Sequence, residues 1–142
     1  MVRLTVNTLE TAPEQAKERM EMVQKANGFI PNLIGVLANS PQVLEMYQEV
    51  GEINSRSSLT PEEIELVQIT AAAHNGCDFC VAGHTKIGTL KLKMPEAVIN
   101  ALRARTTIED NAKYQALAQF TMQLIDQRGK VSDDCRATAS YS

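Results

Sequence analysis

The sequence lacks the features that mark several broad classes of protein. Its 142 residues include only three cysteines, too few for a scaffold held together by disulfides. No apolar run approaches the roughly 20 residues that span a bilayer. The 14 basic and 17 acidic residues give a net charge of −3, and no basic cluster indicates nucleic acid. We therefore expect a globular protein that binds neither nucleic acid nor membrane.

The sequence also has no internal repeat, no low-complexity tract and no strand-like alternation of apolar and polar residues. The segment after Met1 shows no apolar core followed by a small-residue cleavage site, so we expect no signal peptide and a cytoplasmic protein. The length suits one domain over residues 1–142.

Helical signals fill most of the chain, and its glycines and prolines fall almost entirely between them. The first helix should end at Gly28, and Ser40 with Pro41 should open the third. The pattern predicts an all-α bundle of six to seven helices over residues 13–27, 33–38, 40–54, 60–74, 77 onward, 95–105 and 108–128.

Apolar spacing predicts which faces of the first long helices are buried. A stripe on the helix over 13–27 should face the core, and so should a second stripe on the helix over 40–54. The residues are Ala16, Met20, Val23 and Ala26 in the first, and Val43, Met46, Tyr47 and Val50 in the second.

The segment over 60–74 reads as the central helix. Thr60 and Glu63 have the spacing of a capping box, in which each side chain bonds the other residue's backbone N–H. The helix that follows is apolar nearly all round, as expected for an element surrounded by others.

A pair of cysteines and a histidine carries the chemical signal. On a helix, Cys77, Cys80 and His84 fall at i, i+3 and i+7, which places them on one face. Asn75 and Gly76 should place the cysteines in the first turns, where free backbone N–H groups favour a thiolate. The helix end acts most on Cys77, whereas His84 favours Cys80, so the order of attack stays open.

Glu65 is the second candidate, because it lies within the apolar helix, where a carboxylate needs a partner. A helical hairpin would bring it against the cysteine helix, where it could accept a proton from His84.

Other readings of these residues remain open. Zinc could recruit Cys77, Cys80 and His84, with His74 as a fourth ligand, although structural zinc sites draw on two separated pairs. The cysteines could also be buried, inert thiols. His74 is otherwise expected to cap or pack its helix end, and Cys135 is read as incidental.

With these residues in place, the chain resembles the AhpD-like alkylhydroperoxidases of the carboxymuconolactone decarboxylase superfamily. Their motif is Glu, eleven residues, Cys, two residues, Cys, three residues and His, and Glu65, Cys77, Cys80 and His84 match it throughout. The likeness covers roughly residues 14–130, with its core over 60–92. One departure is Phe79, which stands where some peroxidase members have a second histidine.

The resemblance implies an all-helical protein that self-associates as a dimer, trimer or hexamer and reduces small peroxides. By carry-over, Cys80 is the peroxidatic cysteine, Cys77 resolves it, and His84 with Glu65 forms the proton relay. In the best-known members a lipoyl protein or other dithiol is the reductant and a peroxiredoxin is a partner. Neither a cofactor nor a metal ion is expected.

We therefore expect a thiol-dependent peroxidase of antioxidant defence. The first rival is a thiol–disulfide oxidoreductase or redox sensor that forms the same disulfide without turning over peroxide. The second is a metal-binding or purely structural oligomerisation module.

Overall fold

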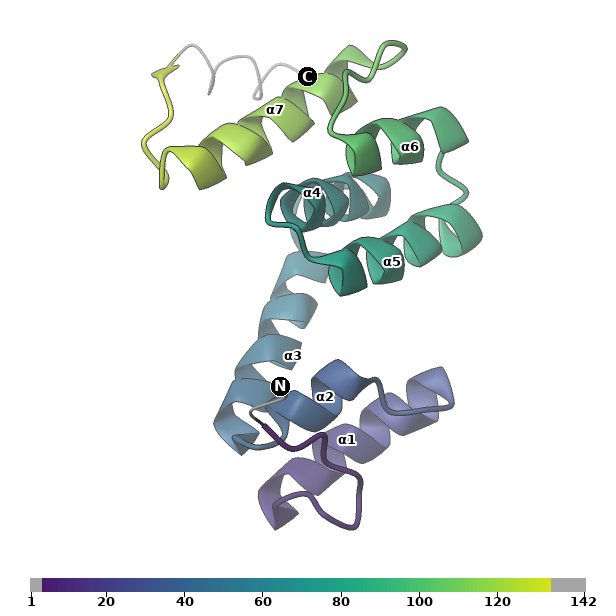
Figure 1. The fold of residues 1–142 in the computed structure, drawn as a ribbon, viewed down its shortest axis with the longest axis vertical. Coiled ribbons are helices and arrows are strands. Elements are labelled where there is room, and N and C mark those ends of the chain that lie inside the picture. The colour runs from purple at the N-terminus through teal and green to yellow at the C-terminus, as the bar shows by residue number, and fades with distance from the viewer. Residues whose placement is uncertain (1–3, 134–142) are drawn as a thin grey trace. The chain divides into compact units, whose positions relative to one another are not determined.

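The computed structural model describes residues 4–133, and the regular secondary structure in this part of the chain is entirely helical. The all-α prediction is confirmed, with seven α-helices and one π-helical segment in the described part (Figure 1). Their bounds are α1 Glu14–Asn27, α2 Asn32–Leu37, α3 Pro41–Ser55, α4 Pro61–His74, α5 Asp78–Lys86, η1 Ile87–Lys91, α6 Glu96–Ala104 and α7 Ala112–Asp126.

Contacts within the chain group it into two compact units, residues 1–56 and 57–142. A single domain over the whole length stays a prediction. No helix among the described residues is long and apolar enough to cross a membrane. Cys135 lies outside the described residues.

The first unit holds α1 to α3 around a small apolar core. α1 ends at Gly28 as predicted, with φ +80°, a conformation that glycine adopts without strain. Arg19 on α1 reaches α3, where it pairs with Glu45 at 2.8 Å and Glu49 at 3.1 Å. The buried side chains of this core are Ala12, Ala16, Met20, Ile34, Ala38 and Leu44.

The prediction for the inner face of α3 was wrong. The face that packs is centred on Leu44, which is fully buried in the apolar core, and Glu45 and Glu49 lie on the side that Arg19 of α1 reaches. Ala26 on α1 is also exposed rather than buried. The α3 residues expected inside are 41–59% exposed: Val43, Met46, Tyr47 and Val50.

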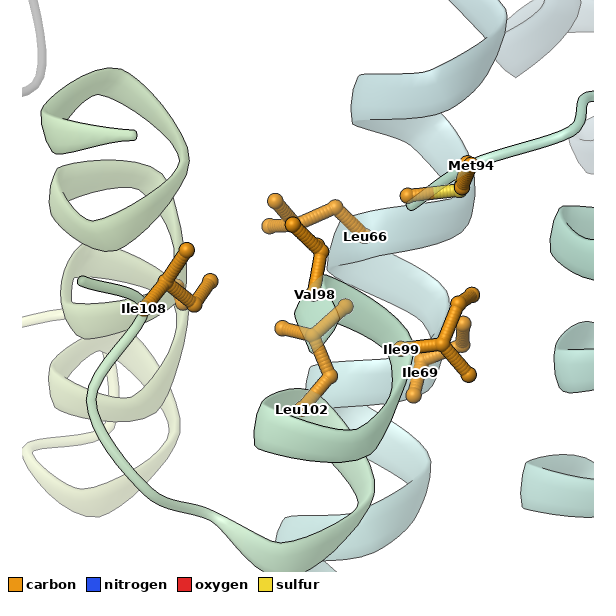
Figure 2. Packing of buried hydrophobic residues seen from close by; sticks show 8 residues of the cluster. Leu66, Ile69, Met94, Val98, Ile99, Leu102 and Ile108 are labelled. Atoms are coloured by element: carbon orange, nitrogen blue, oxygen red, sulfur yellow. The ribbon is translucent and has the colours of Figure 1, made fainter. Parts of the chain in front are cut away.

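The second unit is built around α4, which contacts α5, α6 and α7. Figure 1 shows α4 in the middle of this unit. Figure 2 shows Leu66 of α4 close to Val98 of α6, with Ile108 facing them from the segment before α7. The central position predicted for this helix is confirmed. The buried core is Leu66, Ile69, Met94, Val98, Ile99, Leu102, Ile108 and Ala118.

The predicted capping box opens α4. The Thr60 side chain accepts from the Glu63 N–H, and the Glu63 carboxylate accepts from the Thr60 N–H at 2.7 Å. The buried Glu63 carboxylate also pairs with Lys113 of α7 at 2.9 Å. Together the Thr60 N–H and the Lys113 ammonium lower the pKa of Glu63 below its ordinary value of 4.5.

The capping carboxylate makes stability pH-dependent. Because the folded-state pKa of Glu63 is lowered, its contribution is complete above the ordinary value and is lost as the pH falls through the folded value. We expect Glu63→Gln to lower the free energy of unfolding by about 1 kcal/mol at pH 7. Urea unfolding should show the difference in unfolding free energy between wild type and Glu63→Gln becoming smaller below pH 4.5. The same difference at every pH would contradict this role of Glu63. So would an equal loss of stability in the neighbouring variant Glu62→Gln.

α7 begins later than predicted, at Ala112 rather than Ile108. The Asn111 side chain accepts from the Tyr114 N–H at 2.9 Å and so caps the helix there. Ile108 instead enters the core from the preceding segment, and its N–H donates to the Gln115 side chain. The apolar residue that suggested an earlier start therefore belongs to the loop.

The cysteine helix does not end as an α-helix but continues into η1. The Leu92 N–H bonds the Ile87 carbonyl at 3.1 Å, the five-residue step of a π-helix. Gly88 is the second residue of this segment and is buried. A Cβ added there would lie 2.8 Å from Ile99 Cδ1 and 3.1 Å from Met94 Sδ.

Two glycines on this continuous helix should respond to alanine in opposite directions. Gly88→Ala overpacks the core and should destabilise by about 1–3 kcal/mol. Gly83→Ala has open space and a helical backbone, so it should stabilise by about 0.5–1 kcal/mol. Thermal and urea unfolding of the two variants provides the check. An unchanged free energy of unfolding in Gly88→Ala would show that η1 has room to shift.

Candidate active site

The two cysteines lie where α5 begins, as the sequence predicts. Gly76, with φ +67°, makes the turn out of α4, and Cys77 is the N-terminal cap of α5. Its sulfur accepts the Cys80 N–H at 3.3 Å. The sulfurs of Cys77 and Cys80 are joined in a disulfide, with the Cα atoms 5.3 Å apart. A pair of bonded cysteines is therefore present at the first turn of the helix.

His84 and Glu65 meet across the contact between α5 and α4. Nδ1 of His84 lies 2.9 Å from Oε2 of Glu65. The Glu65 side chain is 12% exposed, so its charge needs this partner, whereas the His84 ring is 28% exposed. The helical hairpin expected from the sequence is confirmed by this contact, which links two elements on either side of the turn at Gly76.

The pairing fixes which nitrogen of His84 is free. An ionised carboxylate only accepts hydrogen bonds, so Nδ1 donates its hydrogen to Glu65. Nε2 of the neutral ring then keeps its lone pair and can accept a proton. Since His84 follows Cys80 by one helical turn, the arrangement supplies a base on the same helix as the disulfide.

His74 does not join this group. Its Nε2 lies 2.7 Å from Oδ1 of Asp126, so it links the end of α4 to the end of α7. This agrees with the expectation that it packs its helix end.

The four residues considered as zinc ligands do not meet at one point but take part in three separate contacts. The two sulfurs are bonded to each other, and the two histidines face different carboxylates. Within residues 4–133 no group of three or more His, Cys, Asp or Glu side chains is placed to hold a metal ion.

Two features near the disulfide were not predicted. The Phe79 side chain, between the cysteines, is 57% exposed. An open cavity is bounded by Gly76 and Asp78, the chain neighbours of Cys77, and by Arg103, which comes from α6. No local pattern marks Arg103, because only the packing of α6 brings it to this place.

Comparison with known proteins places the chain in a family. The profile of the carboxymuconolactone decarboxylase family matches residues 41–122, more than half of the chain. The chain belongs to this family. The matched range includes Glu65, Cys77, Cys80 and His84. The family resemblance noted from the motif is confirmed.

Solved structures show the fold of this family member. One, from Ralstonia eutropha JMP134, is described as an alkylhydroperoxidase AhpD core and an uncharacterized peroxidase-related protein. It is 22% identical, with a TM-score of 0.82 over 98% of this chain and 74% of that one. A peroxidase-related protein from Silicibacter sp. TM1040 is 17% identical, with a TM-score of 0.79 over 99% and 73%. No curated protein matches the chain. The fold is that of the AhpD core.

Proposed function

We propose that the protein is a thiol-dependent peroxidase, similar to alkylhydroperoxidases, that uses Cys77 and Cys80 as its redox pair. The observation that carries the proposal is the hydrogen bond from His84 to Glu65 one helical turn beyond the disulfide. A disulfide alone would serve many purposes, but a buried carboxylate that orients a histidine is typical of nucleophile activation. Membership of the family and the AhpD-core fold support this reading.

The first step would occur at reduced Cys80. Nε2 of His84 takes the thiol proton, and the thiolate attacks one oxygen of the peroxide. The O–O bond breaks, Cys80 becomes a sulfenic acid, and the other oxygen leaves as an alcohol or water after taking a proton. Glu65 keeps the ring in the required tautomer and stabilises its positive charge while it holds the proton.

The second step would regenerate the disulfide. The Cys77 thiolate attacks the Cys80 sulfur, and water leaves. The observed disulfide shows that this helix turn accommodates the bonded form. An external dithiol then restores both thiols by exchange, and a lipoyl-type dithiol fits this requirement. We propose a cytoplasmic setting in antioxidant defence, with a peroxiredoxin as a further partner.

Self-association also stays a proposal. The exposed apolar side chains of α3 are grouped on one helix, and a surface of this kind often contacts another protein. We propose that a second copy covers it in a dimer, trimer or hexamer. Light scattering after size exclusion should give a mass above that of one chain, and Met46→Lys should lower it. A monomer at all concentrations would reject the proposal.

The rival with a specific observation in its favour is a redox sensor without peroxide turnover. Phe79 offers no proton at the position between the cysteines, and it is exposed. Stopped-flow measurement of peroxide consumption with excess dithiol separates the two functions. Repeated turnover that depends on Cys80 supports the peroxidase, whereas disulfide formation without turnover supports the sensor.

A further inference from the structure

The helix that carries the disulfide exposes large apolar side chains to solvent. Phe79 in α5 and Leu90 in η1 are each 57% exposed. The inner side of α5 packs against α4, where His84 contacts Glu65. Exposed apolar side chains on one continuous helix are typical of a surface that contacts another molecule.

The same segment is basic. From Phe79 to Pro95 it holds three lysines and no acidic residue, whereas the whole chain has a net charge of −3. Lys86, Lys91 and Lys93 are exposed, and none of them forms an ion pair within residues 4–133. Three unpaired cations in an acidic chain produce a local positive potential, which attracts a negatively charged partner.

This basic segment borders the disulfide. Phe79 lies between the two bonded cysteines in the chain, and Gly83 lies one helical turn beyond both Phe79 and Cys80. A Cβ at Gly83 would meet nothing within 4 Å, so the outer side of this turn is open. Cys80 itself is only half-buried. A protein seated on the segment would therefore cover the helical turn that carries Cys80.

We propose that this part of α5 and η1 is the docking surface for the protein that reduces the disulfide, and that this partner presents its dithiol beside acidic side chains. We call it the basic surface; its residues are Phe79, Lys86, Leu90, Lys91 and Lys93. Apolar side chains with charged groups around them match the core and the rim of a protein interface. The inference rests on the redox cycle proposed above, and adds to it the docking site and the charge of the donor.

The neighbouring disulfide favours this occupant over two others. An anionic lipid surface would pair with the lysines, but it brings no reducing equivalents to the cysteines. A second copy of this chain, related by a two-fold axis through this surface, would place lysines against lysines. An acidic protein with a dithiol satisfies both the charge and the chemistry.

The electron transfer from such a partner is a pair of exchange steps. One thiolate of the dithiol attacks a sulfur of the Cys77–Cys80 disulfide, forms a mixed disulfide and releases the other cysteine as a thiolate. The second thiolate of the partner then displaces the first cysteine. The dithiol becomes a disulfide, and two electrons and two protons pass to Cys77 and Cys80.

The test uses the oxidised protein without peroxide, so its result does not depend on peroxide turnover. Three synthetic peptides contain the same cysteine–glycine–proline–cysteine dithiol, flanked by glutamates, by glutamines or by lysines. Disulfide reduction is followed by quenching with an alkylating agent and mass spectrometry of the intact protein. Each rate is divided by the rate with dithiothreitol. Comparing a variant with wild type then cancels the reactivity of each peptide's own thiols.

The glutamate-flanked peptide should respond most to the loss of lysines. Lys86→Gln combined with Lys91→Gln should slow its reaction about fivefold relative to the glutamine-flanked peptide, and should speed the lysine-flanked one. The effect should disappear as salt rises from about 0.01 M to about 1 M, because the screening length falls from about 30 Å to about 3 Å. The matched control combines Lys25→Gln with Lys130→Gln, two exposed lysines elsewhere, and should show no selectivity.

The apolar part of the basic surface is tested separately. Leu90→Ser should slow all three peptides by a similar factor, about fivefold relative to dithiothreitol, because the leucine is covered in each complex. Leu124→Ser, at an exposed leucine of α7, is the control and should leave the three rates as they are. Rates in Leu90→Ser equal to those of wild type with every peptide would reject the docking surface.

Other results would also overturn the inference. Equal selectivity in the Lys25 and Lys130 control would show that net charge acts, rather than this surface. Cosedimentation with phosphatidylserine vesicles, together with equal rate ratios for the three peptides, would indicate a membrane. A lower mass of Leu90→Ser in light scattering, with equal rate ratios, would indicate a second copy. Each result leaves the peroxidase proposal intact, which fails only if reduced protein does not consume peroxide.

Discussion

The Cys80→Ser variant should consume no peroxide above the uncatalysed background. In the proposed mechanism Cys80 supplies the sulfur that attacks the peroxide, and a serine hydroxyl cannot be oxidised in its place. The expected loss is essentially complete, and the measurement is peroxide consumption with excess dithiol. Cys80 is half-buried and serine is only slightly smaller than cysteine, so the variant should keep the fold. Circular dichroism would verify this.

The companion variant Cys77→Ser should behave differently. It keeps the attacking sulfur, so one equivalent of peroxide should convert Cys80 to a sulfenic acid that persists because no resolving thiol is present. A dimedone adduct at Cys80 would identify it. Cys135→Ser is the matched control, with unchanged turnover and no adduct. An adduct on Cys77 in Cys80→Ser, together with an inactive Cys77→Ser, would reverse the two roles.

The second large effect is expected for Glu65→Gln. A glutamine of similar shape can present its amide N–H to Nδ1 of His84, which moves the ring hydrogen to Nε2. Nε2, the nitrogen that should take the thiol proton, then carries a hydrogen and has no lone pair to accept another. Loss of a general base costs about 10²–10⁴ in rate, and we expect about 10² because the thiol ionises partly without help.

The pH profile distinguishes this role from a structural one. As the pH rises above about 8.5, the ordinary range for a thiol, Cys80 ionises without a base and the deficit should shrink. Single-turnover rates of reduced Glu65→Gln would test this, with Glu62→Gln on the same helix as the control. The double variant Glu65→Gln with His84→Asn should be little slower than either single variant, because the two residues act as one unit. An unchanged rate would remove Glu65 from the mechanism.

Most helix ends could be predicted because their signals are local. Thr60 and Glu63 form a capping box from residues three apart, and Gly28 provides the left-handed turn that ends α1. These signals depend on the neighbouring residues alone. The predicted start of α7 was too early because the apolar residue Ile108 packs in the core from the preceding loop and is not part of the helix.

The buried faces were harder to predict, since they depend on partners elsewhere in the chain. The stripe that includes Met46 and Val50 has the correct spacing for an inner face, yet the helix packs through Leu44. Leu44 packs against residues of α1 and α2, and Arg19 of α1 contacts Glu45 across 26 residues of sequence, which no periodicity reveals. The close approach of Gly88 to Ile99 of α6 likewise depends on how distant parts of the chain pack.

The candidate site divides in the same way. Cys77, Cys80 and His84 could be grouped from helical spacing, and the carboxylate of Glu65 was suspected because an apolar helix rarely holds one without a partner. The contact of Glu65 with His84 follows from the turn at Gly76, which folds α5 back on α4.

The central claim is that peroxide drives the two neighbouring sulfurs from free thiols to a disulfide. It is tested most directly by mass spectrometry of the fully reduced protein before and after one equivalent of cumene hydroperoxide. The account predicts a loss of two hydrogens, located by digestion to the peptide that carries Cys77 and Cys80. An unchanged mass, or oxygen added at Cys135 or a methionine with both of these thiols still free, would contradict it.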